Sequence, residues 1–178
     1  MTRVLIDACV LYPTVMREVV LGVASEGVFT PLWSDRILEE WARAAARIGE
    51  EATARAEIAL LRAAWPTASV AVSEATDTRL TLPDPCDTHV LAAAIDGEAD
   101  ELMTLNLKDF PTRTLSAEGI IRRDPDGVLM EALSQHPDTV KRVVQRVHAK
   151  AQDLAKEDIP LRALLKRARL PRLGKALQ

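Results

Sequence analysis

The stretch Val-Leu-Ile-Asp at residues 4–7 is the first feature of the sequence that indicates a fold. Three consecutive apolar residues are typical of a buried strand, and Asp7 then places a carboxylate at the carboxyl end of that strand. An unpaired carboxylate is costly beside an apolar core. The position of Asp7 therefore favours a functional site over a solvated surface.

Strand-like and helix-like segments alternate along the rest of the chain. We expect strands over residues 4–6, 69–72, 100–105 and 119–122, and helices over 15–24, 37–48, 50–65, 89–95 and 125–133. Residues 29–33 are interpreted as a link, and 82–87 as a loop. This order predicts an α/β fold with a parallel central sheet flanked by helices. In such sheets, sites lie beyond the carboxyl ends of the strands.

The composition is that of a globular protein. The chain has 178 residues, of which 48% are hydrophobic and 28% are charged. The longest apolar run, residues 90–95, is far shorter than the roughly 18 residues of a membrane helix, and Asp7 interrupts the only apolar stretch that could resemble a signal peptide. Two cysteines, Cys9 and Cys86, cannot form a disulfide framework. We therefore expect reduced thiols, no membrane association and a cytoplasmic protein.

Charge is distributed unevenly along the chain. Residues 1–140 carry a net charge of −11, whereas residues 141–178 carry +8. The spacing of apolar residues predicts a helix over 140–154 and a second one after Asp158. The acidic part is suited to metal ions, and the basic tail to phosphate or to an acidic protein, although a solvated helix surface is an equal alternative. The candidate phosphate-binding residues share one face of the first tail helix: Arg142, Arg146 and Lys150.

Several common catalytic motifs are absent. The seven glycines form neither of the usual nucleotide cradles, and there is no G-x-S-x-G elbow. Phosphatases with an aspartate nucleophile after the first strand usually need a second Asp two residues on, where this chain has Cys9. What remains is a set of oxygen-bearing side chains at the predicted element ends: Asp7, Glu40, Asp84, Asp87, Asn106 and Asp109.

Converging carboxylates of this kind would hold Mg²⁺ or Mn²⁺, and two such ions can activate water against a phosphodiester. Each acid also has a simpler explanation. Asp87 and Asp84 could be ordinary helix-start and turn residues, Glu40 a solvated helix residue, and Asp109 a turn cap. The set gains weight only as a whole.

Four segments resemble the PIN-domain nucleases, and within them the bacterial VapC-like toxins. They are VLIDACVLYP (residues 4–13), LWSDRILEEW (32–41), LPDPCDTHVLAAAI (82–95) and LMTLNLKDFP (102–111). The resemblance covers roughly residues 1–125. Its spacing selects Glu40 rather than Glu39, and Asp87 rather than Asp84.

The resemblance implies a three-layer PIN-like fold in residues 1–125, with residues 126–178 as a basic helical C-terminal extension packed on the same domain. It also implies a metal-dependent endoribonuclease that hydrolyses RNA with water activated by Mg²⁺ or Mn²⁺. Thr104 would contact a water or the scissile phosphate, and Asn106 would supply an amide oxygen or orient a water. The metal ligands carried over by position are Asp7, Glu40, Asp87 and Asp109.

By the same resemblance, the protein would be the toxin of a toxin–antitoxin pair, with an RNA substrate, a small antitoxin partner and a homodimeric state. Asn106 stands where many members have Asp, which keeps a second interpretation open: a non-catalytic PIN-fold module that binds RNA or protein. A third interpretation is a DNA-directed nuclease or a ribosomal-RNA processing enzyme of the same fold.

Overall fold

A computed structural model describes residues 1–178 as two compact units. Residues 1–12 and 30–123 form a unit built on a sheet, and residues 13–29 and 124–178 form a helical unit. None of the helices combines the length and the apolar character that a membrane-spanning segment requires.

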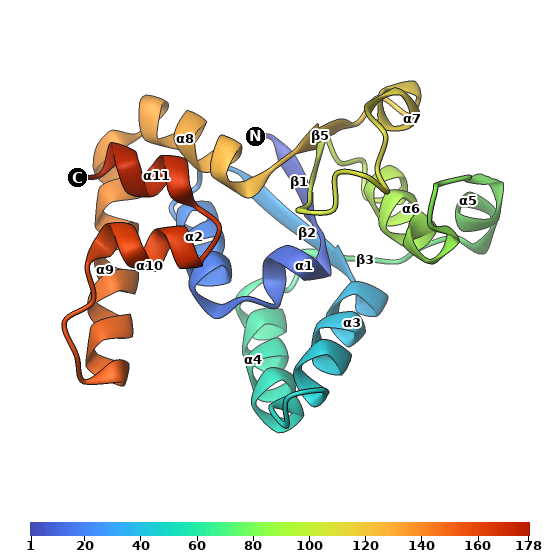
Figure 1. Ribbon diagram of the computed structural model, residues 1–178. Coiled ribbons are helices and arrows are strands. Elements are labelled where there is room, and N and C mark those ends of the chain that lie inside the picture. Colours follow the sequence, from blue (N-terminus) through green and yellow to red (C-terminus); the bar gives the residue numbers. More distant parts are fainter. The chain divides into compact units, whose positions relative to one another are not determined.

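The sheet has five strands, all parallel, in the order β3-β2-β1-β4-β5 (Figure 1). At its centre, Leu5 of β1 is paired with Leu32 of β2 on one side and Leu102 of β4 on the other, and all three are buried. Burial on both faces explains why these strands are short apolar runs. The strands are β1 (Arg3–Ile6), β2 (Thr30–Ser34), β3 (Ser69–Val70), β4 (Glu101–Met103) and β5 (Ile121–Arg123).

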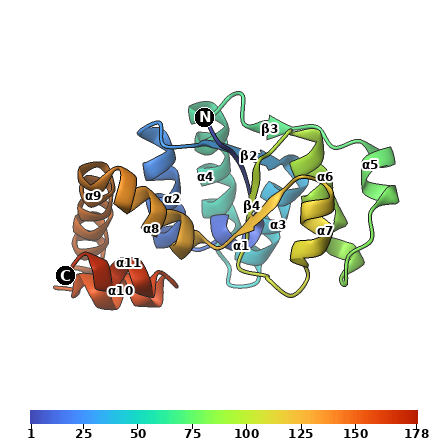
Figure 2. The ribbon, with the colours of Figure 1, turned by 90° about the horizontal axis from the view of Figure 1, so that it is seen from above.

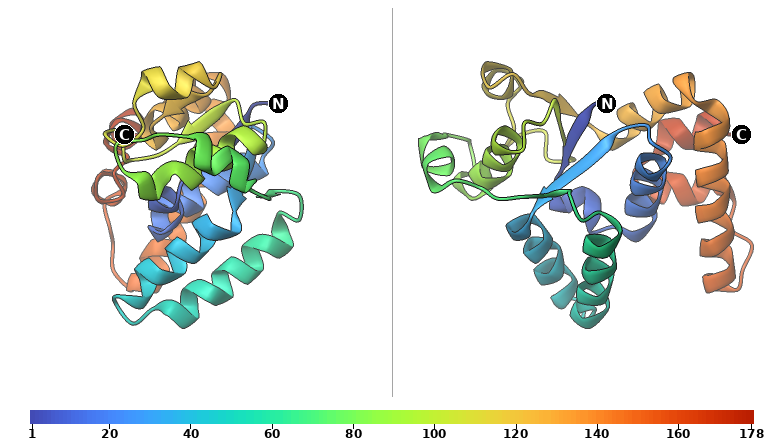
Figure 3. Two further views of the ribbon diagram at one scale, coloured as in Figure 1. Left: turned by 90° about the vertical axis from the view of Figure 1, so that its right-hand side faces the viewer. Right: turned by 180° about the vertical axis from the view of Figure 1, so that it is seen from behind.

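Helices cover both faces of this sheet (Figures 1 and 3). On one face α6 packs against β1, β2 and β4, and on the other α3 packs against α1, α4 and β2. The α/β prediction and its flanked parallel sheet are confirmed. The helices of this unit are α1 (Ala8–Leu11), α3 (Asp35–Ala46), α4 (Glu51–Ala64), α5 (Glu74–Arg79), the 3₁₀ turn η1 (Pro85–Asp87), α6 (Thr88–Asp96) and α7 (Thr112–Ala117).

The interpretation of residues 29–33 as a link was wrong, because β2 runs through them. Pro31 has no N–H and is unusual in a central strand, so the local pattern did not indicate one. Non-local pairing decides the conformation: the Thr30 N–H donates to the Thr2 carbonyl at 2.9 Å, and the Trp33 N–H to the Ala68 carbonyl at 3.0 Å.

The helical unit contains one helix from the N-terminal part of the chain. Helix α2 (Thr14–Ser25) packs against α8 (Pro125–Gln135) and α9 (Pro137–Ala155). Gly22 permits this approach, since a Cβ atom there would lie only 2.6 Å from Cγ1 of Val143. The expected division at residue 125 stays a prediction about the domains. In the structure, α2 belongs to the same unit as the C-terminal helices.

Two short helices complete this unit. Helix α10 (Leu161–Arg167) and helix α11 (Pro171–Ala176) lie side by side (Figure 2). The buried carboxylate of Asp126 on α8 accepts hydrogen bonds from the backbone N–H groups of Arg172 and Leu173, at 2.8 and 3.0 Å. Because these are free donors at a helix start, Asp126 fixes α11 on α8. The second tail helix, expected after Asp158, begins at Leu161, and Pro160 rather than Asp158 stands at its start.

Candidate active site

The candidate site lies where neighbouring parallel strands end. Asp7 follows β1 and Thr104 follows β4, and the last residues of these strands, Ile6 and Met103, are paired. On the other side of β1, Ser34 ends β2 and caps α3 by accepting a hydrogen bond from the Ile37 N–H at 3.2 Å. Strand pairing therefore brings polar side chains from distant parts of the sequence to one edge of the sheet.

Asp7 is held by two side-chain donors. Its Oδ2 accepts a hydrogen bond from the Thr104 hydroxyl at 2.7 Å and one from the Cys9 thiol at 3.1 Å. The Asp7 side chain is buried, and Thr104 is fully buried. Burial and the charge of Asp7 raise the pKa of Cys9 to about 12, so the thiol keeps its proton and remains a donor. The Asp7 carboxylate is thus oriented before any ligand arrives.

A hydrogen-bonded chain continues from Thr104 to Asp87. The Thr104 hydroxyl oxygen accepts from the Asn106 backbone N–H at 2.9 Å, and the Asn106 side-chain amide donates to Oδ2 of Asp87 at 3.1 Å. The amide nitrogen of Asn106 is therefore occupied by its hydrogen bond to Asp87. This arrangement leaves the Asn106 Oδ1 as an acceptor for another group.

Asp84, Asp87 and Asp109 bring carboxylate oxygens within 4.8 Å of one another. Asp84 precedes η1 and caps it, with Oδ1 accepting from the Cys86 N–H at 2.8 Å, while Asp87 ends the same turn. Residues three apart in a 3₁₀ turn lie on the same side, which explains why Asp84 and Asp87 face the same place. Asp109 joins them from the segment after β4.

Glu40 approaches these acids from α3. Its Oε1 lies 2.7 Å from Nε2 of the buried His89, outside hydrogen-bond alignment, and 3.9 Å from the Arg36 guanidinium. His89 is the second residue of α6, two positions after Asp87. Glu40 is thus half-buried against α6, and its negative charge contributes to the raised pKa of Asp87.

The electrostatics confirm that these acids share one environment. The pKa of Asp87 is raised from 3.8 to about 6, first by loss of solvent and then by the negative charges of Asp7, Asp84, Asp109 and Glu40. Burial also raises the pKa of Asp7, with a further contribution from Glu40, although hydrogen bonds from Thr104 and Cys9 oppose the shift. Strongly perturbed carboxyl groups at a strand edge are typical of functional sites.

Comparison with known proteins identifies the fold family. The sequence pattern of the PIN domain matches residues 3–108, which include β1 to β4 and all the acids described above except Asp109, one residue beyond the match. The chain belongs to the PIN domain family. No solved structure matches it significantly.

One curated relative of this PIN domain protein is named "Putative ribonuclease VapC50", from Mycobacterium tuberculosis. The two sequences are 38% identical over 58 residues. The match covers 33% of this chain and 34% of the relative, so the chain spans about a third of that protein's length. The family and this relative support the predicted resemblance to VapC-like PIN nucleases.

The donor set of the PIN domain fits a divalent cation. All the converging ligands are carboxylate or amide oxygens, which hard cations such as Mg²⁺ and Mn²⁺ prefer. The negative charges of its neighbours contribute to the raised pKa of Asp87, after the loss of solvent. A cation among these carboxylates would remove that repulsion and favour their ionised forms.

Of the predicted ligands, Asp87 and Asp109 lie together in one cluster of carboxylates, whereas Asp7 and Glu40 lie outside it and act on Asp87 through their charges. The spacing of the motif favoured Asp87 over Asp84 as a ligand, yet Asp84 lies in the same cluster as Asp87 and Asp109. Sequence reasoning missed the hydrogen bond from Cys9 to Asp7, for which the two-residue spacing after the strand was the available signal. The basic candidates belong to the other unit and lie beside acids: Arg142 and Arg146 are 3.4 and 4.0 Å from Glu26, and Lys150 is 2.6 Å from Glu18.

Proposed function

We propose that this protein is a metal-dependent endoribonuclease that hydrolyses RNA phosphodiester bonds. The observation that carries the proposal is the cluster of Asp84, Asp87 and Asp109, placed beside Asp7 at the carboxyl ends of parallel strands. Membership of the PIN domain family and the relative named as a ribonuclease point the same way.

The site would hold one or two Mg²⁺ or Mn²⁺ ions. When bound, such an ion supplies a Lewis acid that stabilises charge on the phosphodiester and lowers the pKa of a water molecule. The proposed ligands are Asp7, Glu40, Asp87 and Asp109, with Asp84 added from its position in the cluster.

Other residues would position these ligands and the substrate. Thr104 fixes the Oδ2 atom of Asp7. Asn106 fixes Asp87 through its amide nitrogen, so its Oδ1 can accept from a water or a ribose hydroxyl. His89 limits the movement of Glu40. These contacts keep the carboxylates in place, which is the main requirement for stabilising a charged transition state.

No side chain of the site is suited to attack the phosphorus itself. The Cys9 thiol has a pKa of about 12 and is therefore protonated at neutral pH, and thiols attack as thiolates. Water is thus the proposed nucleophile, and the expected products carry 5′-phosphate and 3′-hydroxyl ends.

The biological part of the proposal follows from the VapC-like resemblance. The protein would act in the cytoplasm as the toxin of a toxin–antitoxin pair, and a small antitoxin would inhibit it. A homodimer is the expected oligomeric state. The relative's name, ribonuclease VapC50, supports the toxin assignment over a DNA-directed or ribosomal-RNA processing enzyme.

Two adjacent glutamates on α3 provide a matched test. The charge of Glu40 acts on Asp87, whereas Glu39 pairs with Arg55 at 3.0 Å and with Arg43 at 3.5 Å. With end-labelled RNA and Mn²⁺, Glu40→Gln should lower the rate of cleavage at least about tenfold, and Glu39→Gln should leave it within about twofold. Equal rates for both variants would contradict the site, and no cleavage by the wild type in any metal would favour the non-catalytic binding module.

A further inference from the structure

The helical unit contains a strongly basic segment. Residues 159–178 include six arginine and lysine residues and no acidic residue. Four of the six line one groove of about 680 Å³ on α10 and α11, and all four are exposed: Arg162, Lys166, Arg172 and Lys175. None of these four side chains forms an ion pair with a carboxylate, and Arg162 donates only to the Gln178 side chain, at 3.1 Å. A positive groove without internal counter-charges results.

The basic side chains of α9, unlike those of the groove, lie beside carboxylates. Arg142, Arg146 and Lys150 point toward Glu26 and Glu18 of α2, so acids of the same unit already partly neutralise their charges. Clustered cations that lack such partners create the stronger positive potential. Among the basic residues of the tail, those of the α10–α11 groove are therefore the better anion site.

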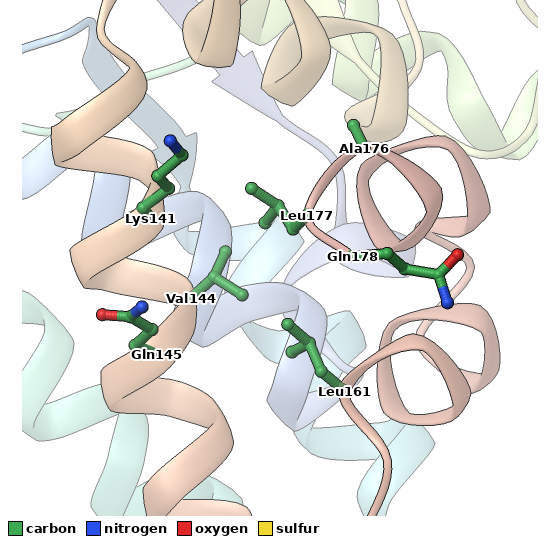
Figure 4. Close-up of a pocket in the computed structure, with 7 residues that line it drawn as sticks. All are labelled: Lys141, Val144, Gln145, Leu161, Ala176, Leu177 and Gln178. Atoms are coloured by element: carbon green, nitrogen blue, oxygen red, sulfur yellow. The ribbon is translucent and has the colours of Figure 1, made fainter.

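One helix of the groove is anchored at its start, and a second pocket adjoins the groove at Gln178. Asp126 fixes the start of α11, as described above. Gln178 also lines a neighbouring pocket of about 300 Å³ with Lys141, where Leu161 and Leu177 reach toward Val144 (Figure 4). Lys141 is exposed and forms no ion pair, so this second pocket also carries a positive charge without a carboxylate partner.

We propose that the α10–α11 groove binds the sugar–phosphate backbone of RNA; this choice of ligand rests on the proposed ribonuclease function. The sheet unit, residues 1–12 and 30–123, has a net charge of −6 and would repel RNA. Binding of RNA then needs cations from elsewhere in the chain, and phosphate contacts by Lys and Arg supply most of the affinity for nucleic acids.

The same lining argues against an acidic protein as the occupant. Residues 159–178 contain no aromatic residue, and the apolar part of the groove consists of Pro160, Ala163 and Pro171. Protein interfaces usually depend on a large apolar anchor in a deep pocket, which this groove does not offer. Without aromatic side chains for base stacking, RNA binding at the groove should also be independent of sequence.

Two triple variants with equal loss of charge test the proposal. One replaces groove cations (Lys166→Gln, Arg172→Gln, Lys175→Gln), and the other replaces paired cations (Arg142→Gln, Arg146→Gln, Lys150→Gln). Binding of a fluorescent single-stranded RNA is measured by anisotropy in EDTA, so that the result does not depend on cleavage. Affinity should fall at least about tenfold for the groove variant and stay within about twofold for the control. The slope of log affinity against log salt should become shallower by about 2 for the groove variant, since three phosphate contacts are lost.

Equal losses in the two variants, or no loss in either, would overturn the proposal. The proposal would also be wrong if the groove variant lost binding to polyglutamate but kept its affinity for RNA, because the groove would then be a site for an acidic protein. Circular dichroism checks the fold, and if the groove variant does not fold, protection of Lys166 and Lys175 from acetylation by bound RNA gives the same test on the wild type. RNA binding at the groove without any metal-dependent cleavage would remove the ribonuclease function and keep this inference.

Discussion

The Thr104 hydroxyl donates a hydrogen bond to Oδ2 of Asp7 at 2.7 Å, joining the ends of two paired parallel strands in a fully buried position. The Thr104 hydroxyl oxygen also accepts a hydrogen bond from the Asn106 backbone N–H at 2.9 Å. One hydroxyl group thus links Asp7 to the segment that carries Asn106 and Asp109. The site depends on this link because Asp7 and Asp87 belong to segments that are far apart in the sequence.

Replacement of Thr104 tests that link. Thr104→Val keeps the shape of the side chain and removes the hydroxyl. The buried Asp7 carboxylate then loses one of its donors and the Asn106 N–H loses its acceptor, at a cost of about 1–3 kcal/mol in the free energy of unfolding. Cleavage should fall about 10–100-fold, as is usual when the support of a metal ligand is lost. Denaturant unfolding and RNA cleavage measure the two effects. Thr104→Ser keeps the hydroxyl and is the control; a loss as large as that of Thr104→Val would contradict the explanation.

Asp84 is expected to be a ligand in its own right. Asp84→Asn retains the cap on η1, since Asn caps as well as Asp does, but it removes one negative charge from the cluster. The concentration of Mn²⁺ needed for half-maximal cleavage should rise about 10–100-fold. Asp35→Asn is the matched control, because Asp35 is exposed on α3 and pairs with Arg62 at 2.9 Å. Unchanged metal dependence in Asp84→Asn would restrict the site to Asp87 and its other neighbours.

Stability should depend on pH through Asp87. The unfolded carboxyl group loses its proton near pH 3.8, whereas the folded one keeps it until about pH 6. The free energy of unfolding should therefore fall as the pH rises through this window, by on the order of 1 kcal/mol, since the side chain is partly exposed and solvent screens the repulsion.

Divalent cations should reverse that loss. Above pH 6 Asp87 is charged, so Mg²⁺ or Mn²⁺ should raise the melting temperature at pH 8 and have a smaller effect at pH 4.5, where Asp87 is protonated. Thermal unfolding at both pH values, with metal or EDTA, measures this. Asp87→Asn should remove both the pH dependence and most of the stabilisation by metal. A metal effect of equal size at pH 4.5 and pH 8 would argue against binding at the carboxylates.

Close packing of α2 on α9 makes Gly22 sensitive to substitution. A Cβ atom at residue 22 would lie 2.6 Å from Cγ1 of Val143, so Gly22→Ala should lower the free energy of unfolding by about 1–3 kcal/mol despite the higher helix propensity of alanine. The double variant Gly22→Ala, Val143→Ala should recover part of the loss in a double-mutant cycle. Strictly additive effects would show that the two residues do not compete for the same space.

The sequence was sufficient for most of the sheet and for the list of acids. Apolar runs that end in a polar residue indicated β1 and β4, because both strands are buried and the chain must leave the core where they end. The strand at Thr30–Ser34 was missed, because Pro31 is unusual in a central strand and the local pattern therefore did not indicate one. Pairing with distant residues makes this segment a strand.

Features that depend on three-dimensional packing could not be predicted. The convergence of Asp84 with Asp109 requires both the 3₁₀ turn of η1 and the pairing of β4 with β1. The neutralisation of Arg142 by Glu26 requires α2 to pack on α9, and no local pattern joins segments separated by so much sequence. Helix periodicity gave the face of α9, but it did not give the partner of that face.

The most direct test of the central claim is cleavage of end-labelled RNA by the purified chain, free of any co-purified protein, in Mg²⁺, Mn²⁺ or EDTA, beside the Asp7→Asn variant. We expect cleavage in Mg²⁺ or Mn²⁺, none in EDTA and none with Asp7→Asn, whose circular dichroism spectrum should match that of the wild type. Cleavage that persists in EDTA, or in the Asp7→Asn variant with metal, would contradict a metal site built on Asp7.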